Sequence, residues 1–361
     1  MLKTDPAVFA VGRDYQIMVP VEAECMMWVK VGDKTYYDES NGVMRSHTLT
    51  HRATVPAEEL DRAGEYTVCT VEMLERKPYF SKTGKTEEKT YAFRPVPKDR
   101  ARAYEIGDAH CDVDEPCAAA AAFGDIDFLI MNGDIPNDGG SEENLLTAYQ
   151  IAERITHGEI PIVFARGNHD VRGVFAENTH RYIPADNGRT FYTFRLGSIW
   201  GLILDCGEDK DDDHPEYGGT VCCHVFRQRQ TEYIKSIIAD AANEYLADGV
   251  EHRIVIAHNP FSRGRDNPPF IIEKEIFSEW SSLLRENVHP DVMIAAHVHE
   301  LEVFEPDDTE GLCPPPCTVV VGTARDNGYY AGTGFEFTPD GITAVSTSND
   351  GRVLMRHTIK S

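Results

Sequence analysis

Residues 160–170 constrain the fold of this chain more strongly than any other segment. An apolar, β-branched run ends there in Gly167, Asn168, His169 and Asp170. Such a run is typical of a buried parallel strand, and a glycine lets the backbone turn sharply where the strand ends. Ligands of open α/β sheets bind just outside the carboxyl ends of the strands. The segment therefore predicts an α/β fold that brings an amide, an imidazole and a carboxylate to its binding edge.

The same pattern extends over the chain from residue 103 onward. It predicts strands at residues 103–106, 127–131, 160–165, 199–204, 253–257, 291–295 and 318–321. Apolar residues at helical spacing predict helices over residues 145–155 and 234–245. The tail, residues 334–359, returns to short alternating strands with a turn at 349–351, which predicts a final hairpin that closes a mixed sheet.

The first 97 residues show the period-two alternation of β-strands instead. Residues 60–68 resemble a tyrosine corner, in which the hydroxyl of Tyr66 ties its strand to the loop just upstream, as in immunoglobulin-like sandwiches. We find no ligand cluster in this region. Its two histidines, His47 and His51, are expected to be strand residues that face solvent.

A segment rich in proline and charge, residues 93–100, marks the predicted domain boundary. We therefore predict a small all-β domain, similar to an immunoglobulin or fibronectin-III sandwich, over residues 1–97. Residues 98–361 are predicted to form a second domain of the α/β (α+β) class.

The net charge of −25 narrows the class of ligand. It argues against a nucleic-acid-binding surface, because phosphate neutralisation needs clustered Lys and Arg. The charge serves solubility alone, or it surrounds a locally positive site for a small substrate. No apolar run approaches the roughly 18 residues that span a membrane, and the N-terminus lacks the apolar core of a signal peptide. The nine cysteines follow no regular framework and are expected to be free thiols in a reducing cytoplasm. The oligomeric state stays open.

Metal-ligand residue types recur at the ends of five predicted strands. They are Asp108, His110, Asp134, Asn168, His258, His297 and His299. A single histidine after a strand is commonly a core or loop residue, and a single aspartate commonly caps a helix. Five such strand ends in one chain favour a metal site instead. Imidazole and carboxylate together suit Zn, Fe, Mn or Ni rather than Ca, and seven such groups suit two ions that share a carboxylate.

In order, the motifs GD-x-H, GD, GNHD, H and H-x-H resemble those of the calcineurin-like metallophosphoesterase superfamily. The resemblance covers residues 100–325 and implies a four-layer αββα fold around a dinuclear metal centre. It implies that the first ion is held by Asp108, His110 and His299. It implies that the second ion is held by Asn168, His258 and His297, and that Asp134 bridges both. His169 would face the scissile phosphate and protonate the leaving-group oxygen or stabilise the transition state.

Three positions depart from patterns of the superfamily. The last motif usually begins with glycine, and here it begins with Ala296. An N-terminal β-sandwich before the catalytic domain resembles the layout of purple acid phosphatases. Those enzymes have a tyrosine where this chain has Asn137, and a different residue type in place of His110. The iron–tyrosinate chromophore is therefore not expected, and the metals stay open among Mn, Fe and Zn.

The resemblance implies a metal-dependent phosphoesterase that hydrolyses phosphate mono- or diesters by attack of a metal-bridging hydroxide. Metal coordination lowers the pKa of water toward ~7, which provides a nucleophile at neutral pH. The expected partner is a small phosphorylated substrate. One alternative is an inactive scaffold or binding module that retains the fold. An amidohydrolase-type barrel is disfavoured because its H-x-H pair comes first in the chain, whereas here it comes last.

Further candidates surround the motifs. Arg166, Arg263 and Arg265 are predicted to contact substrate phosphate, or are solvated loop residues; Arg172, after the third motif, carries the same two interpretations. The long acidic loop of residues 205–219 either overhangs the site and selects substrate or is a surface insertion. Cys111, beside the first motif, is interpreted either as a small buried residue or as a thiol that makes the site sensitive to oxidation.

Overall fold

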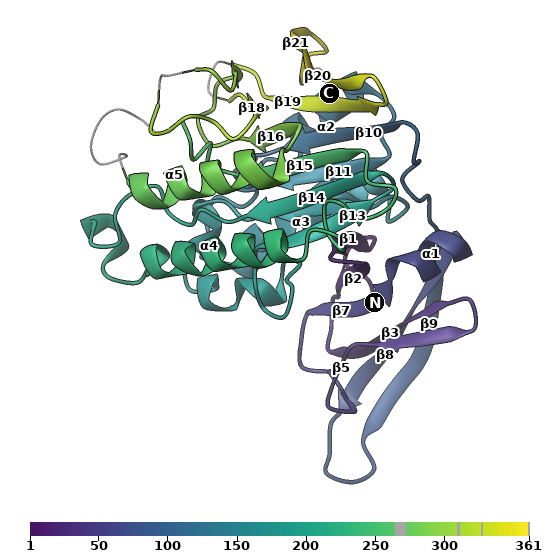
Figure 1. The fold of residues 1–361 in the computed structure, drawn as a ribbon. Coiled ribbons are helices and arrows are strands. Elements are labelled where there is room, and N and C mark those ends of the chain that lie inside the picture. Colours follow the sequence, from purple (N-terminus) through teal and green to yellow (C-terminus); the bar gives the residue numbers. More distant parts are fainter. Residues whose placement is uncertain (264–271, 309–310, 326–327, 360–361) are drawn as a thin grey trace.

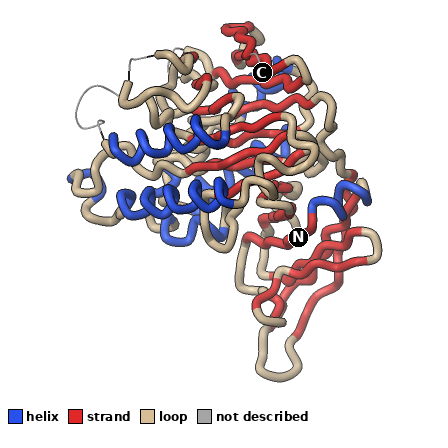
Figure 2. Tube along the Cα trace, viewed as in Figure 1, coloured by secondary structure: helices blue, strands red, loops and turns tan. Residues whose placement is uncertain are grey.

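The computed structural model describes residues 1–263, 272–308, 311–325 and 328–359. Two β-sheets pack face to face, and helices cover the outer face of each sheet (Figure 1). Figure 2 shows the strands in red between helices in blue. The predicted four-layer αββα sandwich is therefore confirmed.

The larger sheet has nine strands in the order β21-β20-β19-β10-β11-β12-β1-β2-β7. Its centre is formed by β10 (Ala101–Ile106), β11 (Phe128–Asn132) and β12 (Ile162–Ala165), which pair in parallel. These strands are almost entirely buried, as expected of strands covered on both faces. One edge is formed by β19 (Ala331–Thr338), β20 (Gly341–Ser348) and β21 (Val353–Ile359), which pair in antiparallel register and confirm the predicted C-terminal strands.

The smaller sheet has six strands in the order β13-β14-β15-β16-β18-β17. They are β13 (Tyr192–Leu196), β14 (Ile199–Leu204), β15 (His252–Ala257), β16 (Val292–Ala295), β17 (Glu302–Phe304) and β18 (Thr318–Val321). The four inner strands, β14, β15, β16 and β18, are parallel. All seven strands predicted between residues 103 and 321 are present in the two sheets.

Two helices pack on each sheet. α2 (Asp114–Phe123) and α3 (Glu142–Thr156) cover the larger sheet, whereas α4 (Cys223–Ala239) and α5 (Lys274–Leu283) cover the smaller one. Short 3₁₀ or π turns occur at η1 (His169–Val171), η2 (Ala176–Arg181), η3 (Pro215–Tyr217) and η4 (Leu284–Val288).

The two predicted helices are found, with one boundary in error. The apolar stripe over residues 145–155 lies in α3, where the Ser141 side chain caps the first turn by accepting from the Asn144 amide at 3.1 Å. The stripe over residues 234–245 overlaps α4, but that helix ends at Ala239. Tyr245 is buried beyond the end of the helix, so its apolar spacing reflected packing and not helical structure.

The first 92 residues are almost all β, as predicted, apart from α1 (Ala57–Ala63). A four-stranded antiparallel sheet contains β3 (Cys25–Val31), β4 (Lys34–Tyr37), β8 (Glu65–Glu75) and β9 (Lys82–Ala92). A small hairpin contains β5 (Glu39–Ser40) and β6 (Val43–Met44). The remaining strands, β1 (Ala7–Val11), β2 (Asp14–Pro20) and β7 (Thr50–Pro56), belong to the larger sheet of the sandwich.

This pairing joins the N-terminal region to the rest of the chain. β1 lies parallel to β12, with Phe9 opposite Ile162, so the larger sheet is continuous across the predicted boundary at residue 97. The division into residues 1–97 and 98–361 stays a prediction. The strand that leads into the third ligand motif is therefore flanked by an N-terminal strand.

Two sequence interpretations in this region were wrong. Residues 60–63 are helical, and the Tyr66 hydroxyl donates to the Gly158 carbonyl at 2.8 Å and not to the upstream loop. His51 is fully buried, with Nδ1 2.7 Å from Asp38 Oδ2 and Nε2 3.4 Å from Cys25 Sγ. Strand alternation could not show which face of each strand packs against another part of the chain.

The helices and the cysteines of the structure bear on two further predictions. Among the described residues, no helix is both long and apolar enough to cross a bilayer. All nine cysteines are free thiols, as predicted.

The Tyr66–Gly158 hydrogen bond provides a test of how the N-terminal region is attached. Tyr66 is 1% exposed, so Tyr66→Phe leaves a buried carbonyl oxygen without its donor. We expect a loss of about 1–3 kcal/mol in the free energy of unfolding, measured by urea denaturation. Tyr79→Phe, at a tyrosine that is 82% exposed, is the matched control and should leave the stability unchanged. Equal stabilities of the two variants would contradict this attachment.

Candidate metal centre

The predicted ligands follow the carboxyl ends of strands in both sheets. Asp108, Asp134 and Asn168 follow β10, β11 and β12 of the larger sheet, and His258 and His297 follow β15 and β16 of the smaller sheet. The strands β10, β11 and β12 are parallel to one another, and so are β15 and β16, so within each sheet the carboxyl ends of these strands lie at one edge. The two packed sheets bring these edges together.

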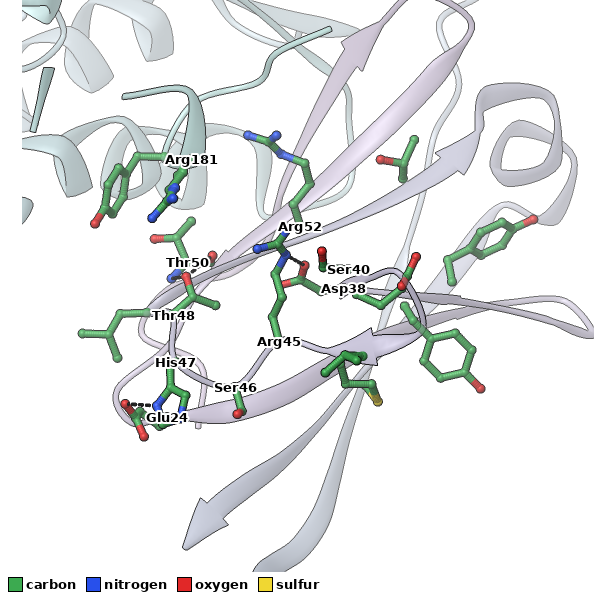
Figure 3. A pocket seen from close by; sticks show the side chains of 18 of the residues that line it. Glu24, Asp38, Ser40, Arg45, Ser46, His47, Thr48, Thr50, Arg52 and Arg181 are labelled. Carbon is green, nitrogen blue, oxygen red and sulfur yellow. Dashed lines mark hydrogen bonds and ion pairs between the residues drawn. The ribbon is translucent and has the colours of Figure 1, made fainter. Parts of the chain in front are cut away.

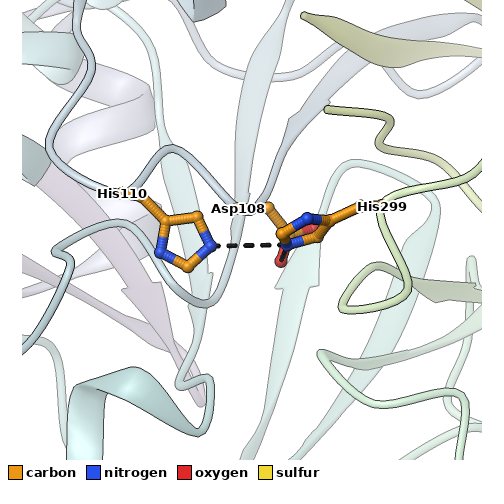
Figure 4. A group of neighbouring side chains, drawn as sticks. All are labelled: Asp108, His110 and His299. Carbon is orange, nitrogen blue, oxygen red and sulfur yellow. Dashed lines mark hydrogen bonds and ion pairs between the residues drawn. The ribbon is translucent and has the colours of Figure 1, made fainter. Parts of the chain in front are cut away.

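The first group of ligands contains Asp108, His110 and His299, whose ligand atoms lie within 4.8 Å of one another (Figure 4). Nε2 of His299 is 3.4 Å from Asp108 Oδ1 and 3.4 Å from His110 Nε2. Asp108 Oδ2 accepts from the Thr323 hydroxyl and from the His297 amide. Asp108 Oδ1 is buried and has no hydrogen-bond donor in the described part of the chain, so its lone pairs are available to a cation.

The second group contains Asp134, His258 and His297. Nε2 of His258 lies 3.2 Å from Asp134 Oδ2, and its Nδ1 donates to the Asn132 carbonyl at 2.6 Å. That bond leaves Nε2 as the coordinating atom. One end of the Asn168 amide lies 3.0 Å from His297 Nδ1 and 3.3 Å from Asp134 Oδ2. With a cation among these acceptors, the oxygen end of Asn168 completes the group.

Asp134 connects the two groups. It also belongs to a third group, with His110 and His169, whose ligand atoms lie within 4.8 Å of one another. His258 Nε2 lies 3.2 Å from Asp134 and 3.7 Å from Asp108 Oδ1. All seven predicted ligands therefore lie together, and Asp134 lies between the His110 side and the His258 side of the site.

The buried carboxylates of this centre require positive charge. Burial lowers the pKa of His258, but the carboxylates of Asp134 and Asp108 outweigh this effect and raise that pKa to about 10. Burial likewise opposes ionisation of Asp134, but His258, His169 and His297 hold its pKa well below the usual range. Divalent cations satisfy the same requirement with more charge, so the residues present fit two metal ions.

The backbone at the ligands adopts a conformation that side chains rarely favour. The φ angles of Asp108, His110, Asp134, His297 and His299 are 52°, 47°, 51°, 73° and 60°. Each left-handed residue costs on the order of 1 kcal/mol, and such residues cluster at functional sites. The sharp turns after the strands therefore direct the ligand side chains inward at a cost in stability.

Two glycines permit close contacts between these turns. A Cβ atom on Gly167 would lie 2.4 Å from the Asp134 amide nitrogen, and one on Gly133 would lie 2.6 Å from His258 Nδ1. Gly133 also has a φ of 75°. The glycine in each motif is therefore needed for the approach of neighbouring ligand loops.

Two buried acids lie behind the ligands: Asp170, which the sequence predicted at the binding edge, and Glu105, which it did not identify. Asp170 Oδ2 accepts from the amides of Gly167 and Asp134 at 2.8 and 2.9 Å, and burial raises the pKa of Asp170 to about 7. Glu105 Oε1 accepts from the Asn132 amide group at 2.6 Å, and burial raises its pKa well above the usual range. Asp170 stands within the GNHD motif, whereas no sequence signal distinguished Glu105 inside β10.

His169 is oriented toward the centre without belonging to the predicted ligand set. Its amide donates to Asp134 Oδ1 at 2.8 Å, and its Nδ1 lies 2.7 Å from the Asn137 carbonyl oxygen. Nε2 is thereby left facing the centre, 3.9 Å from Asp134 Oδ2. An imidazole held in this way presents Nε2 to a group bound at the centre.

The predicted substrate arginines have other contacts. Arg166 Nε donates to the buried Asp205 at 2.6 Å, and the Arg166 guanidinium lies 5.4 Å from the Phe226 ring centroid. Arg263 lies 4.4 Å from the ring centroid of Phe304. Arg265 lies outside the described residues. Substrate binding by these arginines stays a prediction.

Arg172 lies at the centre, although it was only a secondary candidate. Its Nη1 is 3.4 Å from His169 Nε2, and its Nη2 is 3.2 Å from the second end of the Asn168 amide. Its Nε and Nη2 donate to the two carboxylate oxygens of buried Glu208, each at 2.8 Å. This bidentate pair fixes the guanidinium beside the centre.

Glu208 belongs to the acidic loop of residues 205–219, so the ion pair between Arg172 and Glu208 attaches this loop to the metal centre. The next residue, Asp209, has Oδ2 3.8 Å from His297 Nε2. Since His297 Nδ1 faces the second ligand group, Asp209 stands on the opposite side of the same imidazole. Carboxylates in this position commonly orient metal-bound histidines. Of the two interpretations given above, the structure favours a loop that overhangs the site.

Cys111 is exposed, so the interpretation as a buried residue was wrong. Its Sγ accepts from the Asn137 amide at 3.2 Å. The thiol therefore lies next to the residue that holds His169.

Comparison with known proteins agrees with this geometry. Among solved structures, the chain is similar to purple acid phosphatase PPD1 from seeds of yellow lupin (Lupinus luteus), with a TM-score of 0.62 and 14% identity over 100% of this chain and 75% of that chain. It is also similar to Vacuolar Protein Sorting 29 from Cryptosporidium parvum, with a TM-score of 0.38 and 11% identity over 73% of this chain and 100% of that chain. No curated protein matches the chain.

The lupin protein shares the overall fold over the whole of this chain, including its N-terminal β region. Residues 102–301 match the family model described as calcineurin-like phosphoesterase. All seven predicted ligand positions lie within this match. The chain therefore belongs to the calcineurin-like phosphoesterase family.

Proposed function

We propose that this protein hydrolyses phosphate mono- or diesters at a dinuclear metal centre. The observation that carries the proposal is the convergence of seven ligand-type side chains into two neighbouring groups, in which Asp134 of the second group also lies within 4.8 Å of His110 of the first. A family member that had become an inactive scaffold would be expected to lose ligands, and all seven are present. Mn, Fe and Zn all fit the nitrogen and oxygen ligands.

The ligand assignment follows from the two groups. Asp108, His110 and His299 would hold one ion, Asn168, His258 and His297 the other, and Asp134 would bridge them. When bound, two divalent ions activate water at neutral pH and neutralise charge on the phosphate.

His169 and Arg172 have complementary roles in the proposal. The oxygen of water bonds to phosphorus and loses a proton to solvent, while the ester P–O bond breaks. His169, when protonated at both ring nitrogens, would donate its Nε2 proton to the departing oxygen. The bond between His169 Nδ1 and the Asn137 carbonyl keeps Nε2 directed at the centre. Arg172 presents Nη1 to the same space and can donate to a phosphate oxygen.

Substrate choice is assigned to the loop of residues 205–219. Its Glu208 and Asp209 lie at the centre, so substrate must fit beneath acidic side chains that are paired with Arg172 and Lys210. A small phosphorylated compound is the proposed substrate class. The cytoplasmic location also remains a proposal, which the free thiols of all nine cysteines support.

Reconstitution tests the proposal directly. The full chain is loaded with Mn, Fe or Zn and assayed with p-nitrophenyl phosphate and bis-p-nitrophenyl phosphate, while bound metal is counted by elemental analysis. Asp134→Asn should lose bound metal and lower hydrolysis by roughly 100-fold or more, because a bridging ligand to both ions is weakened.

Asp340→Asn, in the exposed turn between β19 and β20, is the matched control and should behave as the wild type. Preference for the monoester identifies a phosphatase, and preference for the diester identifies a phosphodiesterase. Two equivalents of metal without turnover of any phosphate ester would favour the inactive scaffold. Full turnover by Asp134→Asn would end the proposal.

The acidic loop provides a second prediction. Asp209→Asn removes the charge that faces His297 Nε2 while preserving the shape of the side chain. We expect metal affinity to fall by roughly 10–100-fold, as for other residues that orient a metal-bound histidine. The affinity of the full chain for Zn or Mn is measured by calorimetry, independently of catalysis.

Asp213→Asn changes the same charge at an exposed position of the same loop and controls for the general electrostatic effect. An equal loss of affinity in both variants would mean that Asp209 acts only through its charge. Unchanged affinity in Asp209→Asn would contradict its orienting role.

A further inference from the structure

A groove of about 1260 Å³ lies where the N-terminal strands meet the catalytic sandwich. One wall consists of β4, the β5–β6 hairpin and β7, and the other contains residues 180–182 and the start of α3. Figure 3 labels Thr50, Arg52 and Arg181 among the side chains around it. Among the described residues that line the groove, none belongs to the metal centre. We call this cavity the junction groove.

The junction groove contains buried polar atoms without partners. Thr50 is 6% exposed, and its Oγ1 has no hydrogen-bond partner within the described ranges. The same holds for Nε of Arg52. Both residues face the groove from β7, two positions apart and therefore on one side of the strand. Buried polar groups of native proteins are normally satisfied, so these two atoms indicate a missing acceptor.

The charges indicate what kind of acceptor is missing. Nη2 of Arg52 donates to the backbone carbonyls of His180 and Ile183 at 2.7 and 2.6 Å, and no carboxylate of the described chain forms an ion pair with it. Arg181, on the facing wall, likewise forms no ion pair among the described residues. Burial, and then the charges of Arg181 and Arg52, lower the pKa of His180. Arg52 and Arg181 therefore both lie near His180 at the groove.

Two other pairs of charged residues in the groove are compensated. Arg45 lies 3.2 Å from Asp38 Oδ1, and His47 lies 2.8 Å from Glu24 Oε1. Glu142 lines the same wall as Arg181 without an ion pair to it in the described structure. Arg76 and Glu39 also line the groove and form no ion pair in the described structure. Three arginines against two glutamates therefore lack a charged partner around this groove, in a protein with a net charge of −25.

The rest of the lining is partly apolar. Tyr37, Val43 and Leu49 line the groove and are 52%, 56% and 40% exposed. Exposed apolar side chains that line one groove are typical of ligand-binding grooves. A ligand that fills the groove therefore combines an anionic group with an apolar part.

We propose that the junction groove is a second binding site, independent of the metals, for an organic anion that carries a phosphate or carboxylate group. The anionic group accepts from Arg52 Nε, from the guanidinium of Arg181 and from the Thr50 hydroxyl. The apolar part of the ligand packs on Tyr37, Val43 and Leu49. Because β7 is paired with β2 and lies in the same sheet as β12, the site is built on the sheet that carries the third ligand motif.

Calorimetry on the metal-loaded full chain tests this site with two probes. Phenylphosphonate has a P–C bond in place of an ester bond, and benzoate carries a carboxylate on the same ring. We expect phenylphosphonate to bind to the wild type at two sites, the metal centre and the junction groove. The Asp134→Asn variant should no longer bind it at the metal centre but should still bind it in the groove. Arg181→Gln should weaken the groove event roughly tenfold or more, because one charge-assisted hydrogen bond is lost.

Two further variants sharpen the result. Thr50→Val removes only the hydroxyl and should weaken the groove event several-fold, whereas Arg229→Gln, at an exposed arginine of α4, should leave it unchanged. Binding of benzoate in the groove event shows that a carboxylate suffices, and binding of phenylphosphonate alone assigns a phosphate ligand. Absence of a second event, or a second event that is unaffected by Arg181→Gln and Thr50→Val, would overturn the proposal.

Discussion

The need to balance the buried carboxylates of Asp108 and Asp134 shapes the centre of this protein. Both are almost completely buried at strand ends, where an uncompensated charge is costly. The surrounding histidines respond, as the raised pKa of His258 shows, and five ligand residues adopt left-handed backbone conformations to bring the charges together. The strain and the buried charge are tolerated because two layers of β-sheet hold the turns in place. A site of this kind is stable only with cations, whether protons on imidazole or metal ions.

The support behind the ligands is polar and as buried as the ligands themselves. Asp170 joins the turns after β11 and β12 by accepting from two backbone amides, and Glu105 fixes Asn132, whose carbonyl fixes His258. These bonds set which nitrogen of His258 faces the centre. The orientation of the ligands thus depends on residues that belong to the sheets and not only on the motifs.

The N-terminal strands take part in this scaffold. β1 pairs with β12 directly upstream of Gly167, and Tyr66 binds the carbonyl of Gly158 just before the same strand. The N-terminal region therefore supports the segment that carries Asn168 and His169. On the opposite side, the loop of residues 205–219 closes over the centre through Arg172 and Glu208. The N-terminal strands and this loop both contact the αββα sandwich near its third motif.

The sequence alone predicted the strands, their order as α/β units and the seven candidate ligands that the structure brings together, because apolar runs ending in Gly, Asp, Asn and His carry local signals. It did not reveal α2, whose run of alanines has little amphipathic contrast, or the burial of His51, which depends on the layer that covers its strand. Three contacts join residues that are far apart in the chain. They are the pairing of β1 with β12, the hydrogen bond from Tyr66 to Gly158 and the ion pair of Arg172 with Glu208. Local periodicity contains no information on such contacts, since they are decided by which faces and loops the folded sheets bring together.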